Sequence, residues 1–178
     1  MIKVALSISI YYYLLAAASF FCTYLIFSKW LKGKRMRISS LIAYVVLFFS
    51  STVLARETYT TARIQLVPFW SYTNLAGSFR NGFLAQIVFN ILAFVPIGAL
   101  LMSIIGHRKI SFLICMCVSM TIEISQLVLH RGLCEVDDLI HNSIGGFIGI
   151  NVYVNRTAIM NQLRRARSKI RKWLRIKE

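Results

Sequence analysis

The acidic side chains of this chain are concentrated in one stretch that runs from residue 123 to residue 149. It holds four of the six acids among 178 residues, and apolar segments flank it. A charge at the centre of a bilayer costs ~2.5–3.5 kcal/mol or more, so ionisable groups in such segments usually face a protein interior and mark a working site. We therefore expect a binding or catalytic site here. The competing interpretation is a buried polar network that only locks helices together.

Six polar side chains make up the ligand-binding cluster that we expect. Three apolar segments and one turn supply them: Asn90, Glu123, Gln126, Arg131, Asp138 and Asn142. At 1.5 Å per residue along a helix, Asn90 and Glu123 both lie ~10 Å below the outer membrane surface. Asn142 lies ~6 Å deep by the same count. Nothing in the order of the chain requires polar groups on three segments to reach a similar depth, so the agreement favours a common site.

Further residues are expected to support this cluster by packing or by shaping its surroundings. They are Pro68, Phe69, Phe94, Pro96, Gly98, Glu135, Gly145 and Gly149. One narrow helical stripe, at i, i+4, i+7 and i+11, joins Asp138 and Asn142 to the last two of these glycines. Small residues four apart let a second helix approach closely. Pro96 removes one backbone hydrogen bond and predicts a kink, which either serves helix packing alone or shapes the site beside Asn90.

The turn between the last two apolar segments carries charged residues with several candidate roles. Arg131 is expected to hold an acid in an Arg–carboxylate fork. Its candidate partners are Glu123, Glu135 and Asp138. Asp137 is expected to cap the helix that follows, where an acid also suits the helix dipole. From His130 and His141, which flank the turn, we expect packing or hydrogen bonding rather than acid–base catalysis.

The longest segment outside the apolar runs, residues 56–82, has two candidate arrangements. Its aromatic residues predict anchoring at the lipid headgroups, which is the arrangement that we favour. The alternative is a lid over the polar cluster, formed by Arg63, Gln65, Pro68 and Phe69.

Metal, redox and covalent chemistry find little support in the sequence. The four cysteines are Cys22, Cys115, Cys117 and Cys134, and three of them lie in apolar runs, where cysteine acts as a small hydrophobe. Cys and His pairs with metal-ligand spacing are missing, so we expect no metal and no cofactor. A nucleophile with a base and an oxyanion hole is not visible either, and no catalytic residue is assigned.

Composition indicates an integral membrane protein. The chain is 57% hydrophobic, with a mean hydropathy of +0.65, whereas soluble domains are about 45–50% apolar. A transmembrane helix needs about 20 predominantly apolar residues. The candidate spans are 4–27, 38–55, 83–105, 110–130 and 138–155. The predicted fold is an all-α, polytopic transmembrane bundle of about five helices, and a four-span arrangement with a re-entrant last segment is the alternative.

The distribution of positive charge predicts the orientation. Net charge is +15, and sixteen of the 21 basic residues fall on one side of the five spans. The positive-inside rule then puts the N-terminus outside and the C-terminus in the cytoplasm. This divides the chain into a transmembrane domain, residues 1–155, and a basic cytoplasmic tail, residues 156–178.

The tail alternates apolar and basic residues at helical spacing. This pattern predicts a basic amphipathic helix on the anionic lipid of the inner leaflet. A solvated tail that only sets the topology is an equal alternative. Aromatic residues for base stacking do not accompany the basic ones, so we expect no nucleic-acid binding.

Several motifs occur in a specific order over about half of the chain, residues 63–154. They are Gln65-Leu66-Val67-Pro68-Phe69, Asn90 to Gly98, Glu123-x-x-Gln126, and Arg131 through Asp138, Asn142, Gly145 and Gly149. Together they resemble the VanZ family, with Gln65 standing where that family more often has Asn. The resemblance implies a small protein of the bacterial cytoplasmic membrane. It also implies a role like that of the best-known relatives, which confer low-level resistance to teicoplanin and related lipoglycopeptides without altering the peptidoglycan stem peptide.

Three functions follow as hypotheses. The first, which we favour, is a non-enzymatic envelope factor that binds a lipid or lipid-linked cell-wall precursor in the outer leaflet, or shields it from the drug. The second is an intramembrane enzyme that acts on an envelope lipid, with Glu123 or Asp138 as acid or base. The third is a lipid transporter, which five spans without an inverted repeat disfavour. The sequence assigns neither the ligand nor the oligomeric state.

Overall fold

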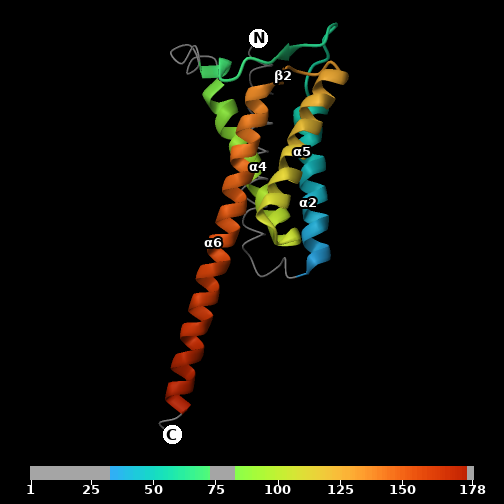
Figure 1. Cartoon of the computed structure of the whole chain (residues 1–178). Helices are drawn as coiled ribbons and strands as arrows, with labels where there is room; N and C mark the ends of the chain where they lie inside the picture. The colour runs from blue at the N-terminus through green and yellow to red at the C-terminus, as the bar shows by residue number, and fades with distance from the viewer. Residues whose placement is uncertain (1–32, 73–82, 176–178) are drawn as a thin grey trace.

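The computed structural model describes residues 33–72 and 83–175, and within them it is a bundle of helices (Figure 1). The elements are α2 (Lys34–Phe49), the π-helix η1 (Ser50–Leu54), β1 (Ile64–Gln65), the 3₁₀-helix η2 (Trp70–Tyr72), α4 (Phe83–Ile105), α5 (Arg108–Val128), β2 (Cys134–Glu135) and α6 (Val136–Arg175). The two short strands pair with each other. The predicted all-α bundle is confirmed.

Three helical segments in the described part of the chain are long and apolar enough to cross a membrane. They are Lys34–Leu54, Leu84–Ile105 and Arg108–Val128, which match the second, third and fourth predicted spans. The span predicted at 4–27 lies outside the described residues. The span predicted at 138–155 is part of α6, which begins with buried acids and amides and is not apolar enough to join the three.

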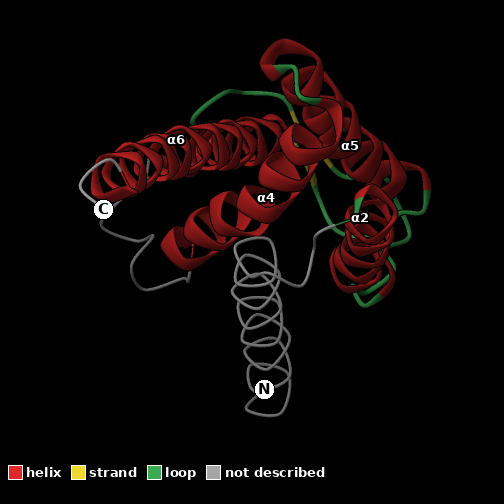
Figure 2. Ribbon diagram, turned by 90° about the horizontal axis from the view of Figure 1, so that it is seen from below, coloured by secondary structure: helices red, strands yellow, loops and turns green. Residues whose placement is uncertain are grey.

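Helix α4 is the centre of the bundle because it contacts α2, α5 and α6. Seen along the bundle in Figure 2, α4 lies between α6 and α2, with α5 alongside. The interface of α4 with α6 is the most extensive one. Both helices that carry the predicted polar stripes, α5 and α6, therefore face a common neighbour.

The α4–α6 interface is close because glycines replace side chains on both helices. A Cβ atom on Gly145 would overlap the carbonyl oxygen of Ile91, and one on Gly149 would overlap that of Val95. Gly98 makes the reciprocal approach from α4 toward α6. Small residues at these positions let the two backbones pack in van der Waals contact, which drives helix association in lipid.

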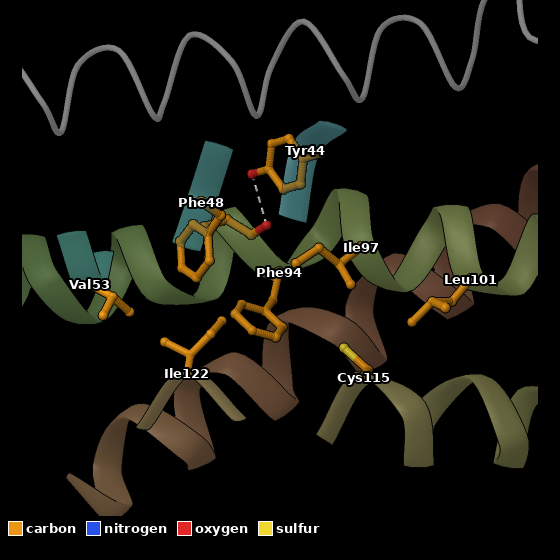
Figure 3. Close-up of a cluster of buried hydrophobic side chains, with 9 residues drawn as sticks. Tyr44, Phe48, Val53, Phe94, Ile97, Leu101, Cys115 and Ile122 are labelled. Atoms are coloured by element: carbon orange, nitrogen blue, oxygen red, sulfur yellow. Dashed lines mark hydrogen bonds between the residues drawn. The ribbon is translucent and has the colours of Figure 1, made fainter. Parts of the chain in front are cut away.

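An apolar core forms where α2, α4 and α5 meet (Figure 3). Phe48 and Phe94 pack edge to face, with ring centroids 5.5 Å apart, an arrangement worth about 0.5–1.5 kcal/mol beyond area burial. The Tyr44 hydroxyl donates to the carbonyl of Ala93 over 2.9 Å, the dashed line in Figure 3. This core holds α4 in one rotation about its axis and so directs its polar residues toward α6.

The basic tail is a direct continuation of α6. The helix passes residue 155 without a break and reaches Arg175, and its lower half extends beyond the other helices in Figure 1. Its 40 residues make a helix about 60 Å long. Residues 157–167 are exposed throughout. The predicted tail is therefore helical, and the predicted domain boundary falls inside one continuous helix.

Candidate functional site

The polar cluster lies at one end of the bundle, under a segment that we call the lid (residues 56–72). Strand β1 of the lid pairs in parallel with β2, so that Gln65 lies opposite Glu135. The Tyr59 amide donates to the carbonyl of His130 over 2.8 Å. This pairing fits the lid arrangement, and Figure 1 shows the strand of the segment against β2 at the top of the bundle. Anchoring of the aromatic residues at the lipid headgroups stays a prediction.

The turn after α5 makes this pairing feasible because it reverses the chain within a few residues. His130 and Gly132 both adopt positive φ, 53° and 93°. Glycine reaches this conformation at no steric cost. A Cβ atom on Gly132 would also meet the side chain of Arg56, so glycine at this position leaves room for a guanidinium from the lid.

Three carboxylates are buried together under the lid. Glu123, Glu135 and Asp138 retain only 6%, 6% and 5% of their surface exposed. Glu123 accepts a hydrogen bond from the backbone amide of Glu135 over 3.0 Å. Asp138 accepts one from the side-chain amide of Asn90 over 2.5 Å and another from the side chain of Gln86. Neutral donors therefore hold these acids in place.

Two buried amide side chains border the carboxylates. Asn142 donates from Nδ2 to the hydroxyl of Ser119 over 2.9 Å. Gln126 donates from Nε2 to the carbonyl of Thr52 over 3.1 Å. The carbonyl oxygens of both amides are buried and have no partner among the described residues, and the same holds for Nδ1 of His141. Buried polar atoms usually have a hydrogen-bond partner, so each exception requires an explanation.

Asp137 fastens the lid to α6. Its two carboxylate oxygens accept the backbone amides of Phe69, over 2.5 Å, and of Ser71, over 3.0 Å. The sequence predicted a helix cap from Asp137, and the structure shows it bound to the lid. Phe69 has a φ of 62°, which is uncommon for a residue with a side chain. One turn along α6, His141 Nε2 lies 2.7 Å from the hydroxyl of Tyr72.

Arg131 does not form the predicted carboxylate fork. Its guanidinium donates to the backbone carbonyl of Leu54, and more weakly to that of Arg56 over 3.5 Å. These carbonyls are available because the π-helix η1 ends at Leu54. Short π-helical segments often occur at functional sites. The corrected role of Arg131 is to fix the end of η1.

Arg56 is the basic residue whose charge acts on the buried acids. Its guanidinium interacts electrostatically with Glu123, Glu135 and Asp138. Burial raises the pKa of Glu135 to about 7, helped by the charge of Asp138 and opposed by the neighbouring indole of Trp70 and by Arg56. None of the three carboxylates forms an ion pair with a basic side chain in the part of the chain that the structure describes.

Of the supporting residues predicted from the sequence, Glu135 is one of the buried carboxylates, and the others divide into two groups. Pro68 and Phe69 belong to the lid, and Phe69 is 58% exposed. Phe94, Pro96 and the glycines are packing residues: Phe94 is fully buried in the apolar core, and α4 continues through Pro96 as far as Ile105. The site itself therefore consists of the lid, the carboxylates and the amides above that core.

Five residues of the site were not predicted from the sequence. They are Arg56, Ser71, Tyr72, Gln86 and Ser119. Two carried a signal, since Gln86 lies four residues before Asn90 and Ser119 four residues before Glu123, which places each pair on one helix face. The other three lie in the lid, where no periodicity indicates which side chains turn inward.

The described residues form no metal site. Residues 33–72 and 83–175 contain no group of three or more His, Cys, Asp or Glu side chains that could hold a metal ion. Cys134 lies next to the carboxylates as a free thiol. What the site offers is a set of buried hydrogen-bond acceptors, closed by a lid.

Comparisons with known proteins agree with the motifs. The family model described as VanZ/LLP1 matches residues 37–160, which include most of α2, the lid and the polar cluster. The chain is 29% identical over 126 residues to Protein VanZ of Enterococcus faecium, and the match covers 68% of this chain and 71% of that protein. No solved structure matches. With its apolar helices and this match over most of its length, the chain is a membrane protein that belongs to the VanZ/LLP1 family.

Proposed function

We propose that this protein is a non-enzymatic factor of the bacterial cytoplasmic membrane that binds a lipid or a lipid-linked cell-wall precursor in the outer leaflet. By doing so it would shield the ligand from teicoplanin and related lipoglycopeptides. The similarity to Protein VanZ supports the link to these drugs. The charge asymmetry of the sequence supports an orientation with the lid outside and the C-terminus in the cytoplasm.

The observation that carries the proposal is the burial of the polar cluster beneath the lid. Carboxylates and amides from α4, α5 and α6 converge there, and part of their hydrogen-bonding capacity is unused within the described residues. The lid above them exposes a run of apolar side chains: Ile64, Leu66, Val67 and Phe69. Polar groups beneath an exposed apolar surface suit a ligand that has a polar head and an acyl chain.

The exposed stretch of α6 from residue 157 to residue 167 supports a second contact, with anionic lipid of the inner leaflet, because it carries Arg164, Arg165 and Arg167. Each basic residue near such a surface contributes about 1 kcal/mol of attraction. The test is binding of a tail peptide, residues 156–178, to anionic vesicles. Replacing Arg164, Arg165 and Arg167 by Gln should weaken that binding, and high salt should do the same. Equal binding to neutral and anionic vesicles would contradict the proposed contact.

The main test is the lipid that co-purifies with the full-length protein. Mass spectrometry of the wild type should detect a bound envelope lipid or precursor, and Glu123→Gln should lose most of it. Teicoplanin susceptibility of a host that expresses each protein at matched membrane abundance should change in parallel. The result follows because Glu123 is buried in the cluster, and Gln replaces a carboxyl group of the cluster by an amide.

Glu57→Gln is the matched control, because Glu57 is an exposed acid of the lid. It should keep both the bound lipid and the susceptibility of the wild type. The proposed function fails if Glu123→Gln, folded and at equal abundance, retains both as well. In that case the buried polar groups serve only to hold the helices together.

A further inference from the structure

The polar cluster holds more hydrogen-bond acceptors than donors. Glu123, Glu135 and Asp138 together present six carboxylate oxygens, and Arg56 is the one basic residue among the described ones whose positive charge acts on all three. Glu123 and Asp138 accept hydrogen bonds from amides, which are neutral. Buried charge without compensation is strongly unfavourable, so the site favours a further cation or bound protons.

Gln126 supplies an independent observation, an acceptor oxygen whose hydrogen-bond donor the described residues do not supply. Its Nε2 atom must face Thr52, because the partner there is a backbone carbonyl that can only accept. This fixes Oε1 as the remaining end of the amide, and Oε1 is buried without a partner in the described chain, on a side chain that is 2% exposed. Gln126 lies three residues after Glu123, on the same face of α5.

Asn142 repeats the pattern on α6. It is also 2% exposed, and its Oδ1 has no partner among residues 33–72 and 83–175. Its bond to Ser119 lies one helical turn from the carboxylates, because Ser119 and Asn142 each stand four residues from an acid of the cluster, Glu123 and Asp138. On both helices, therefore, a side chain with an unpartnered acceptor oxygen stands about one helical turn from a buried carboxylate.

The chemistry of these acceptors suits an organic cation. A metal ion needs several ligands around one centre at about 2.0–2.6 Å, and the described residues contain no group of three or more His, Cys, Asp or Glu side chains that could hold one. An N–H donor needs a single acceptor oxygen at about 2.9 Å. A primary ammonium carries three such donors and a positive charge.

We infer that the cluster of Glu123, Glu135, Asp138, Gln126 and Asn142 is a recognition site for the primary ammonium group of an amine-bearing ligand. This inference rests on the proposed function and names the chemistry by which the ligand is selected. Two sources of the group fit the site. One is the headgroup of an aminophospholipid, and the other is the amine of a lipid-linked peptide.

The test compares probes that differ only at the nitrogen, using the full-length protein in neutral detergent. A short-chain phosphatidylethanolamine represents the lipid source, with its N-acetyl derivative and the matching phosphatidylcholine as controls. Nα-acetyl-lysine amide represents the peptide source, with its Nε-acetyl form as control. One of the two amines should bind at least roughly tenfold more tightly than its controls, because those controls lack the charge or the N–H donors. The arm that responds identifies the source.

Variants then assign the binding to the cluster. Glu123→Gln and Glu135→Gln should each weaken binding of the responding amine by roughly tenfold, and Glu57→Gln should leave it unchanged. The comparison of probes on the wild type does not depend on whether these variants fold. Equal binding of amine and acetylated probes, equal binding of phosphatidylcholine, or no binding of either amine would overturn the inference.

This result is separable from the test of the proposed function. If Glu123→Gln loses the co-purified lipid and alters teicoplanin susceptibility while the probes show no preference for the amine, only the ammonium inference fails. If the co-purified lipid and susceptibility do not depend on Glu123, the proposed function fails.

Discussion

The carboxyl group of Glu135 is placed where burial controls its ionisation. Its pKa is raised to about 7 by burial and by the neighbouring charge of Asp138, with Trp70 and Arg56 opposing. The unfolded chain has an ordinary glutamate, with a pKa of about 4.3. The folded protein therefore binds more protons between these two values, and its stability should decrease as the pH rises from about 4.3 to about 7.

Glu135→Gln should flatten this part of the pH profile. The change in stability is measured by thermal unfolding in detergent at pH 5 and at pH 8. The wild type should lose more stability between these two pH values than Glu135→Gln does. Glu57→Gln, at an exposed acid, should keep the wild-type profile. Parallel profiles for all three proteins would contradict the raised pKa of Glu135.

Asp137 should control whether the lid stays closed. Asp137→Ala removes the acceptor of both the Phe69 and the Ser71 amides, and a hydrogen bond to a charged group is worth about 1.5–3 kcal/mol. Hydrogen exchange of these two amides should accelerate in the variant while the amides of α4 keep their protection. Unchanged exchange at both amides would mean that pairing of β1 with β2 alone holds the lid.

At the scale of elements, the glycine contacts of α4 and α6 should determine the stability of the bundle. Gly149→Leu places a side chain against the carbonyl of Val95, where the opposing atoms are backbone and cannot rotate away. Overpacking of this kind costs about 1–3 kcal/mol or more, and it should move Asp138 and Asn142 out of register. Thermal stability in detergent and the amount of co-purified lipid should fall together.

Substitutions at two other glycines show what to compare with the effect of Gly149→Leu. Gly33→Ala is the control, since a Cβ atom added at Gly33 would meet nothing within 4 Å, and it should be neutral. Gly146 lies on a different face of the helix from the stripe of Gly145 and Gly149, and from sequence alone it is therefore predicted to tolerate Ala. The structure places it against the thiol of Cys115 on α5, so Gly146→Ala should be destabilising unless Cys115 is also made smaller. A stable Gly149→Leu would show that α6 does not depend on this close approach.

At the scale of the whole molecule, the proposed orientation puts the lid outside and the end of α6 inside. Single cysteines at Thr60 and Ser168, on a background without other cysteines, should respond differently to an impermeant thiol reagent in intact cells. The Thr60 cysteine should be labelled, and the Ser168 cysteine should be labelled only after the cells are opened. The reverse pattern would move the polar cluster to the inner leaflet and remove the basis for drug shielding.

Much of the molecule was determined by local sequence. Long apolar runs, such as those at 83–105 and 110–130, can satisfy their backbone polar groups in a membrane only as helices, and the structure has helices there. Glycines four apart on one stripe predicted a close helix contact, which the α4–α6 interface shows. Counting residues predicted a common site for Asn90, Glu123 and Asn142, and in the structure Asn90 is hydrogen-bonded to Asp138, one helical turn before Asn142.

The pairing of charges and the path of the lid were decided only by the tertiary structure. Sequence proximity suggested Arg131 as the partner of the acids, yet its guanidinium lies on the backbone of η1, and Arg56, distant in sequence, acts on them instead. Helix periodicity specifies which residues share a face, but it does not specify how neighbouring helices are rotated or where an irregular segment folds back. Those depend on the glycine contacts, the Tyr44–Ala93 bond and the Asp137 anchor, which form only when segments far apart in the chain have packed together.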